Sequence, residues 1–232
     1  MIKARYLELS KPKDGRRFAI SDIHGCVESF KGILRQISLK TTDQLFLVGD
    51  LVNRGPSSDL VIDHYLKLKN DGFQIYFIRG NHDQTILNTH KKTIGQRKRI
   101  LGTLYAQNLL ENGFIKEKYL NAIQESYHYI KLDDFYLVHA GFNFKSANPF
   151  ENVYAMMNTR SFKAKKKFLE GRRIIIGHTP KDLAKIMRKI KKGKRKLYID
   201  NGCVNYKTRG QGNLICLNLD SMAISVQKNL DY

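Results

Sequence analysis

The segment Gln44-Leu45-Phe46-Leu47-Val48-Gly49-Asp50 is a β-rich apolar run that ends in a glycine and a carboxylate. It predicts a buried strand that runs into a loop. Two similar apolar runs, Arg16–Ser21 and Phe73–Ile78, flank it along the chain, and Val27–Ile37 and Ser58–Lys69 between them carry apolar residues at helical spacing. The first 80 residues are thus predicted to be strand–helix–strand–helix–strand, which is typical of a mainly parallel sheet with helices on its faces.

The rest of the chain continues this mixed pattern. Residues 83–125 are expected to be helical with interruptions at glycines, and another helix is expected at 181–190. The expected strands of this part are 127–132, 134–138, 173–176, 196–199, 213–218 and 222–226, of which the first two form a hairpin. Since no linker or composition break interrupts the 232 residues, we expect a single domain over 1–232.

Composition excludes several classes of protein. With 42% hydrophobic and 27% charged residues, the chain is globular rather than disordered. No apolar run reaches the roughly 18 residues that a membrane helix needs, and the start lacks the apolar core of a secretory signal. The cysteines Cys26, Cys203 and Cys216 are unclustered, which favours reduced thiols in a cytoplasmic protein.

Charge is concentrated in one segment. The whole chain has 41 basic and 21 acidic residues, and residues 160–196 supply +14 of the net +20. Such a segment favours a polyanionic partner, although a lysine-rich surface from compositional bias explains it equally well. Its densest part, 188–196, has no aromatic residue on which bases could stack, so nucleic acid is a disfavoured partner.

Five short blocks after predicted strands combine glycine with oxygen or imidazole donors. Open α/β sheets place their ligand sites at these strand ends. The blocks are Ser21-Asp22-Ile23-His24-Gly25, Gly49-Asp50-Leu51-Val52-Asn53-Arg54-Gly55-Pro56, Arg79-Gly80-Asn81-His82-Asp83, Val138-His139-Ala140-Gly141 and Gly177-His178-Thr179-Pro180. A mixed set of Asp, His and Asn donors suits Mn, Fe or Zn rather than Ca. By contrast, His64, His90 and His128 lie in helix or hairpin surroundings and are expected to be structural.

Together the blocks resemble the calcineurin-like metallophosphoesterase superfamily, and within it the phosphoprotein phosphatase branch, over about residues 16–226. The resemblance implies an α/β fold, a four-layer α/β/β/α sandwich with two mixed β-sheets. It also implies two divalent metal ions, with manganese favoured and iron or zinc as alternatives. The implied ligands are Asp22, His24 and Asp50 for the first ion, and Asp50, Asn81, His139 and His178 for the second.

The same resemblance assigns catalytic roles. His82 matches the general acid that protonates the leaving oxygen, and Arg54 matches an arginine that binds the substrate phosphate. Arg160 resembles the second phosphate arginine. Asn53 stands where the protein phosphatases usually have Asp, so we expect it to orient His82 through its amide oxygen without adding charge. His82 would then lose its catalytic proton at a lower pH.

Two enzymatic functions and one binding function are consistent with these residues. The first is a serine/threonine protein phosphatase that hydrolyses phosphomonoesters by attack of a hydroxide bound at the dinuclear metal centre. The alternative is a symmetrical dinucleoside tetraphosphate hydrolase, which residues 22–26, 49–56 and 80–83 resemble, while 177–180 and 199–214 resemble small bacterial phosphatases. A binder of nucleic acid or polyphosphate is disfavoured because all six ligand positions hold competent residues. The substrate is therefore expected to be a phosphoprotein or a nucleotide polyphosphate, and the oligomeric state is not predicted.

The basic run 188–196 carries one further hypothesis. Gly193 within it is typical of a loop tip, and the run follows His178 closely in the sequence. We expect it on the side of the active site, where it would steer acidic substrates toward the metal ions.

Overall fold

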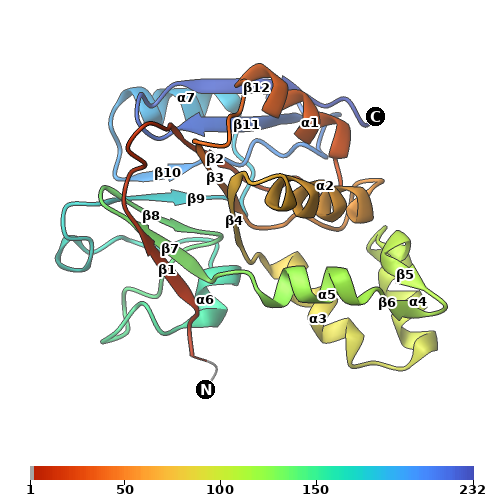
Figure 1. The fold of residues 1–232 in the computed structure, drawn as a ribbon. Coiled ribbons are helices and arrows are strands. Elements are labelled where there is room, and N and C mark those ends of the chain that lie inside the picture. Colours follow the sequence, from red (N-terminus) through yellow and green to blue (C-terminus); the bar gives the residue numbers. More distant parts are fainter. Residues whose placement is uncertain (1–2) are drawn as a thin grey trace.

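The computed structural model describes residues 3–232, and its strands form two five-stranded sheets that lie against each other (Figure 1). The strands of the first sheet are β2 (Arg17–Ile20), β3 (Gln44–Val48), β4 (Gln74–Ile78), β11 (Asn213–Asn218) and β12 (Ile224–Lys228). The strands of the second are β1 (Tyr6–Leu9), β7 (Tyr129–Leu132), β8 (Phe135–Val138), β9 (Arg173–Ile176) and β10 (Lys196–Tyr198). Their orders are β12-β11-β2-β3-β4 and β1-β7-β8-β9-β10.

Both sheets are mixed, as predicted. In the first sheet β2, β3 and β4 are parallel, while β11 pairs antiparallel with β2 and with β12. In the second sheet β7 and β8 form the predicted antiparallel hairpin, and β8, β9 and β10 are parallel. Strand β1, which pairs parallel with β7, was not predicted. Because the parallel strands of each sheet share a direction, their carboxyl ends meet at one edge of the molecule.

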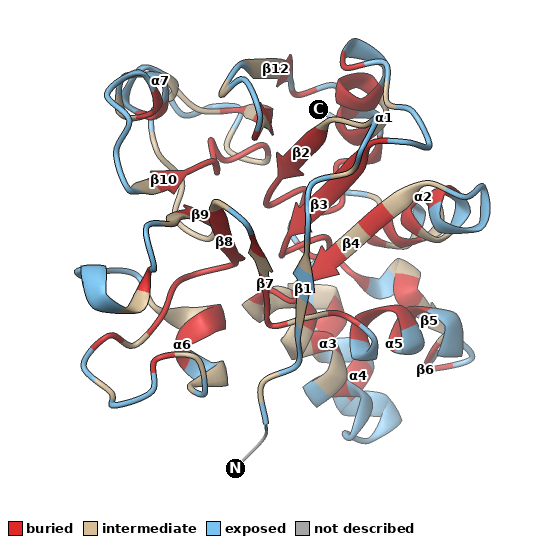
Figure 2. Ribbon diagram, turned by 60° about the vertical axis from the view of Figure 1, so that its left-hand side comes forward, coloured by how far each residue is buried: buried red, intermediate tan, exposed pale blue. Residues whose placement is uncertain are grey.

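The inner faces of the two sheets share one apolar core. Phe46 and Ile78 from the first sheet and Leu137 and Ile175 from the second belong to the same buried cluster. Figure 2 shows the strands β2, β3 and β8 in the colour of buried residues, and β9 is buried after its first residue. This packing explains why β3 reads as a continuous apolar run, since a central strand between two layers is covered on both faces.

Helices α1 (Val27–Gln36) and α2 (Ser58–Asn70) cover the outer face of the first sheet. Helices α3 (Asn81–His90), α4 (Ile94–Thr103) and α5 (Glu117–Gln124) form a cluster that packs on α2. The helical prediction for 83–125 missed a short 3₁₀ turn at Gln107–Leu109 and the hairpin of β5 (Leu110–Glu111) and β6 (Phe114–Ile115). Its two turn residues, Asn112 and Gly113, have φ of 51° and 81°. An Asn-Gly pair with positive φ at both positions is the usual two-residue hairpin turn.

The outer face of the second sheet is covered mostly by irregular chain. The segment between β8 and β9 contains one short helix, α6 (Val153–Asn158), and the 3₁₀ turn Lys166–Phe168. Aromatic side chains fill this layer, and Phe142, Phe144 and Tyr136 form one buried cluster with the outer residues of β8 and β9. The predicted outer layer is therefore present, but over the second sheet it consists mainly of packed aromatic side chains rather than long helices.

The position of the basic run differs from the prediction. Helix α7 (Leu183–Lys191) follows His178 and leads back to the start of β10. Lys196, the first residue of β10, pairs with Ile174 at the start of β9, whereas His178 follows the end of β9. The turn at 192–195 therefore lies at the edge opposite His178, and the expectation of an active-site position is wrong. Gly193 does lie in a turn, with φ of 57°.

A helix long and apolar enough to cross a membrane is not found in residues 3–232.

Arg17 joins the two sheets at this opposite edge. Its side chain is only 4% exposed, and its guanidinium donates to Asp134 in the β7–β8 turn at 2.9 and 3.1 Å. The Arg17 Nε also donates to Asp220 in the β11–β12 turn at 3.0 Å. A single buried cation thus neutralises two carboxylates that belong to different sheets.

Replacing this cation should destabilise the fold. We expect Arg17→Met to lower the free energy of unfolding by about 2–4 kcal/mol, because it removes the buried cation that Asp134 and Asp220 share and leaves Asp134 without an ion-pair partner among the described residues. Lys11→Met is the matched control, since Lys11 also pairs with Asp220, at 3.1 Å, but is 54% exposed. Its loss should cost less than about 1 kcal/mol. Urea unfolding of both variants measures the difference, and equal losses would show that burial of Arg17 contributes nothing.

Candidate metal centre

The five glycine-containing blocks meet in one cleft of about 150 Å³ at the carboxyl ends of the parallel strands. The residues that line the cleft are Asp22, His24, Asp50, Arg54, Asn81, His82, Arg160, His178, Pro180, Asp200, Gly202, Val204 and Asn205. His139 is fully buried, and its Nε2 lies 3.3 Å from the Oδ2 of Asp50. Nine of the ten residues singled out from the sequence thus lie in or directly against this cleft. The tenth, Asn53, contacts the lining residue His82.

Asp50 is the common member of two groups of possible metal ligands. One group is His24, Asp50 and His82, and the other is Asp50, His139 and His178, with the donor atoms of each group within 4.8 Å of one another. The Oδ2 of Asp50 lies 3.7 Å from His24 Nε2 and 3.3 Å from His139 Nε2. A carboxylate between two such groups can bridge two cations through its two oxygens.

An amide oxygen and two imidazole nitrogens converge beside Asp50. The Asn81 Oδ1 lies 2.9 Å from His178 Nδ1 and 3.1 Å from His139 Nε2, and the two imidazole nitrogens are 3.2 Å apart. Ligands at right angles around one ion, with bonds of about 2.1 Å, are themselves about 3.0 Å apart. The spacing and the N/O chemistry of these donors therefore fit a divalent transition metal.

Backbone carbonyls orient two of the imidazoles. His24 Nδ1 lies 3.0 Å from the carbonyl oxygen of Val52, and His139 Nδ1 lies 3.0 Å from that of Val48. Since a carbonyl oxygen only accepts, each Nδ1 carries a proton and each Nε2 faces the cleft. Burial lowers the pKa of His24 to about 4, so this ring is neutral and its Nε2 is free to bind a metal ion.

The Asp50–His139 pair favours a cation between them. Burial opposes protonation of His139, but the adjacent Asp50 carboxylate outweighs it and raises the pKa of His139 to about 10. Burial likewise opposes ionisation of Asp50, yet the adjacent His139 holds the pKa of Asp50 far below its usual value. The site therefore keeps a negative charge that a proton or a metal ion can balance.

Asp22 reaches the cleft in a different way. It is buried, and its carboxylate accepts hydrogen bonds from the backbone N–H of His178 at 2.9 and 3.1 Å and from the hydroxyl of Ser21. It belongs to neither of the two ligand groups. Burial raises the pKa of Asp22 to about 7. The structure thus places Asp22 in the wall of the cleft, and its role as a ligand stays a prediction.

Asn53 and Arg54 contact the two ring nitrogens of His82. Arg54 Nη2 lies 3.2 Å from His82 Nε2, and Asn53 Nδ2 lies 3.1 Å from His82 Nδ1, while Asn53 Oδ1 is buried and has no partner among residues 3–232. A guanidinium only donates, so Nε2 accepts and a neutral His82 carries its proton on Nδ1. Rotating the amide of Asn53 by 180° then places its oxygen to accept from Nδ1–H. The hydrogen-bond pattern thus agrees with the expected role of the amide oxygen.

The cleft also concentrates backbone strain. Among residues 3–232, six of the eleven non-glycine residues with positive φ belong to its motifs, namely Asp22, His24, Asp50, Asn53, Arg54 and His178. Such residues cost free energy and cluster at functional sites. Two glycines permit the close packing around them, because a Cβ at Gly49 would collide with the His139 ring and one at Gly80 with Asp50.

Asp83 has a positioning role that the sequence did not reveal. It is fully buried, and its carboxylate accepts from the backbone N–H groups of Asp50 at 2.8 Å, Leu51 at 3.0 Å and Gly80 at 2.8 Å. It therefore holds two of the ligand-bearing loops against each other. Asp200 shapes the loop after β10, since it accepts from the N–H of Gly202 at 2.7 Å.

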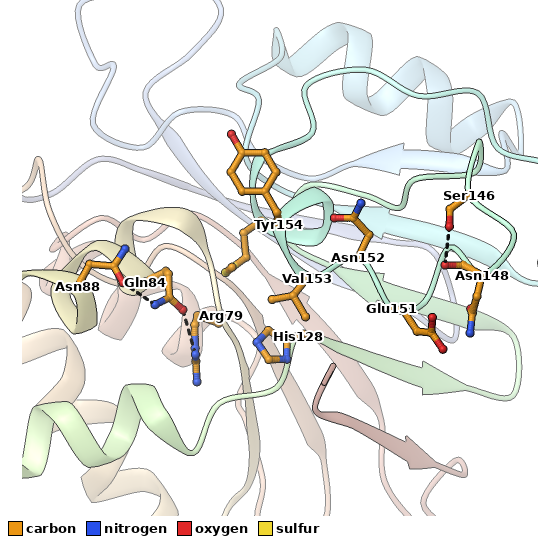
Figure 3. Close-up of a pocket in the computed structure, with 11 residues that line it drawn as sticks. Arg79, Gln84, Asn88, His128, Ser146, Asn148, Glu151, Asn152, Val153 and Tyr154 are labelled. Atoms are coloured by element: carbon orange, nitrogen blue, oxygen red, sulfur yellow. Dashed lines mark hydrogen bonds between the residues drawn. The ribbon is translucent and has the colours of Figure 1, made fainter. Parts of the chain in front are cut away.

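A larger cavity of about 610 Å³ lies between α3 and α6, and it is lined on one side by the hydrogen-bonded chain of Arg79, Gln84 and Asn88 (Figure 3). His128 in this cavity accepts from the N–H of Arg5 at 2.8 Å, which fits its expected structural role. His64, also expected to be structural, packs edge-on against Phe30.

Comparisons with known proteins identify relatives of the whole fold and of part of the sequence. A family profile described as Calcineurin-like phosphoesterase matches residues 16–216. A Buchnera aphidicola subsp. Acyrthosiphon pisum (strain 5A) protein named bis(5'-nucleosyl)-tetraphosphatase, symmetrical, is 39% identical over 74 residues, which are 32% of this chain and 26% of that protein. A protein of the same name from Nitrosococcus oceani is 44% identical over 71 residues, 30% of this chain and 24% of that protein. The matched segment spans about a quarter of these curated relatives.

Solved structures of low sequence identity share the fold. A crystal structure described as a candidate diadenosine tetraphosphatase has a TM-score of 0.70 at 21% identity, covering 99% of this chain and 100% of that one. A protein serine/threonine phosphatase from Saccharomyces cerevisiae with similarity to human PP5 has a TM-score of 0.65 at 14% identity, covering 99% and 85%.

Removing the shared carboxylate tests the metal centre directly. We expect the wild-type chain to bind about two manganese ions and Asp50→Asn to bind fewer than about one, because Asp50 serves both groups. Asp71→Asn, which removes the same charge from an exposed helix end, should leave the metal content unchanged. Metal content is measured by mass spectrometry after dialysis, and an unaltered content in Asp50→Asn would contradict a bridging role.

Proposed function

The chain belongs to the calcineurin-like phosphoesterase family, and from this premise we propose that it hydrolyses nucleotide polyphosphates, with symmetrical dinucleoside tetraphosphates as the substrate class. The observation that carries the proposal is the cleft in which two groups of ligands share Asp50 and two arginines, Arg54 and Arg160, line the rim. The curated relatives named as symmetrical bis(5'-nucleosyl)-tetraphosphatases support the substrate class.

The proposed metal ligands are those expected from the sequence. They are Asp22, His24 and Asp50 for one ion and Asp50, Asn81, His139 and His178 for the other, with manganese favoured. Two divalent ions bound there would act as Lewis acids on a phosphoryl group and would make water a better nucleophile at neutral pH. The ring orientations imposed by Val48 and Val52 leave two imidazole Nε2 atoms free for this purpose.

The remaining polar residues of the cleft bind and protonate the substrate. Arg54 and Arg160 would hold phosphoryl oxygens, because a guanidinium offers paired donors that match a phosphate. His82 would give a proton to the leaving oxygen. Burial lowers the pKa of His82, and Arg54 lowers it further, so the ring releases a proton readily. Asn53 would hold the ring in place through Nδ1.

A serine/threonine protein phosphatase is the second candidate. It is supported by the back half of the sequence, where only 39 residues separate His139 from His178 and the block at 177–180 resembles phosphatases. The PP5-like neighbour shares the fold alone. We further propose a cytoplasmic location, supported by three free, buried cysteines, and a single domain, supported by the core that the two sheets share.

Turnover of two substrates distinguishes these candidates. We expect the manganese-loaded protein to hydrolyse a dinucleoside tetraphosphate with a kcat/KM at least about tenfold above that for a phosphoserine peptide, because the polyphosphate carries more charge for the two rim arginines. Released nucleotide and released phosphate are measured side by side at equal enzyme concentration. A tenfold preference for the peptide would instead establish the protein phosphatase.

The Asn53–His82 contact predicts a shift in the pH–rate profile. A general acid acts in its protonated form, so activity falls as pH rises through its pKa. Because Asn53 is neutral, Asn53→Asp should raise the pKa of His82 and move the alkaline limb upward by about one pH unit. Asn88 lies on the exposed side of α3, the helix that contains His82, and Asn88→Asp should leave the alkaline limb unchanged. Superimposable profiles for wild type and Asn53→Asp would contradict the contact's role.

A further inference from the structure

A second cavity lies beside Arg160 and has chemistry unlike that of the metal cleft. Its volume is about 660 Å³, within the range of small-ligand pockets. The residues that line it are Phe142, Asn143, Phe144, Lys145, Thr159, Ser161, Phe162, Lys163, Ala164, Lys165, Lys166 and Lys167. Five lysines and three phenylalanines dominate this set, and none of the described residues lining it is acidic.

The cavity shares a wall with the metal cleft. Thr159 and Ser161 line the cavity, whereas Arg160 between them lines the cleft. Side chains that alternate along a chain with extended backbone face opposite sides, and Thr159 has extended angles, φ −68° and ψ 122°. Only the backbone of residues 159–161 therefore separates a ligand held by Arg160 from the cavity.

Packing against neighbours fixes the aromatic floor. The rings of Phe144 and Phe162 stack with their centroids 5.7 Å apart at 30°. Phe162 also packs on Gly141, where a Cβ would collide with the ring. Lys196 donates to the carbonyl oxygen of Phe162 at 2.7 Å and lies 4.5 Å above its ring. Phe144 is buried, so Phe162, which is partly exposed, is the ring that a ligand can reach. Its position is fixed without a ligand, which lowers the entropic cost of binding a flat group.

The lysines surround this floor with positive charge. Lys145, Lys163 and the run Lys165–Lys167 are exposed, and Glu170 is the nearest acidic residue along the segment. Aromatic rings beside lysines suit a ligand that joins a flat ring system to phosphates. A phosphoserine or phosphothreonine peptide would use the charge but has no flat group at a fixed distance from its phosphate.

We propose that this cavity binds a nucleotide, with the base against the partly exposed Phe162 and the phosphates beside the lysines. The proposal rests on the proposed function, and it assigns the cavity to the distal nucleotide of a dinucleoside polyphosphate whose phosphates cross the wall at Arg160. The size of the cavity, the phenylalanine floor and the lysine rim each match one part of that ligand.

Photolabelling tests the site independently of hydrolysis. The manganese-loaded protein is irradiated with 8-azido-ATP, and the modified peptides are identified by mass spectrometry. We expect adducts within 142–145 or 159–167, and an excess of ATP should suppress them. Adducts confined to other segments would overturn the proposal. Labelling in a protein that does not hydrolyse dinucleoside tetraphosphates would refute the proposed function but not this site.

Kinetics of charge-reversed variants test the same site during turnover. Lys163→Glu with Lys166→Glu should raise the KM for a dinucleoside tetraphosphate about tenfold or more relative to that for p-nitrophenyl phosphate, which has no distal nucleotide. Lys191→Glu with Lys192→Glu makes the same charge change at the far edge and is the matched control. Equal effects of the two double variants, or an equal effect on a phosphopeptide, would overturn the assignment.

The variant Phe162→Leu tests the contact with the base separately from the contribution of the lysine charges. Leucine keeps the apolar contact with Gly141 but removes the ring, so the KM for the dinucleoside tetraphosphate should rise about tenfold, the size expected for one lost base–aromatic stack. The KM for p-nitrophenyl phosphate provides the reference for general damage to the fold. A rise of equal size for both substrates would count against stacking at Phe162.

Discussion

The buried carboxylate of Asp50 is the constraint on which the cleft depends. It is almost fully enclosed, and it lies within 3.3 to 3.7 Å of two imidazole nitrogens. An ionised carboxylate in such a place is costly unless positive charge and hydrogen bonds surround it. The N–H of His82 donates to its Oδ1 at 2.9 Å, and the histidines on both sides supply positive character or ligands for a cation. The blocks from five strand ends converge because each contributes to balancing this group.

The backbone around Asp50 explains why glycines and acidic residues recur in these blocks. Asp83 binds the N–H groups of two loops at once, so the position of Asp50 depends on a residue that does not face the cleft. Strained φ values at Asp50, His24 and His178 persist because the core between the sheets fixes the strand ends from which these residues follow. The apolar core thus contributes to function by stabilising a backbone that would otherwise relax.

Much of the fold could be predicted because its strands and helices leave recognisable apolar patterns within short segments of the sequence. The bounds of β3, Gln44–Val48, were predicted from its apolar run, since burial on both faces leaves no alternation to interpret. Strand β1 was missed because its exposure alternates at an edge and its partner β7 lies more than 120 residues away. The hairpin at Asn112-Gly113 was missed although its turn signal is present in the sequence.

The residues of the candidate site could be predicted from the sequence, but the hydrogen bonds that connect them could not. The motif letters locate Asp50, His139 and His178, whereas the roles of Asp83 and of the Val48 and Val52 carbonyls depend on distances between segments. The position of the 188–196 run was wrong for a related reason. Closeness to His178 in sequence does not give closeness in space when a helix carries the chain back to the other edge of the sheet.

Because α7 carries the chain back to the far edge of the sheet, the positive charge of the chain lies in two places, with different consequences. The lysines at 163–167 surround a cavity that shares a wall with the metal cleft, while those at 191–195 lie at the far edge. At physiological ionic strength, exposed charges farther apart than about 8 Å are largely screened. The net charge of +20 is therefore a poor measure of attraction to the cleft. The part that can act on a bound polyphosphate is the part next to Arg160, where the partly exposed ring of Phe162 adds a selectivity that charge alone cannot provide.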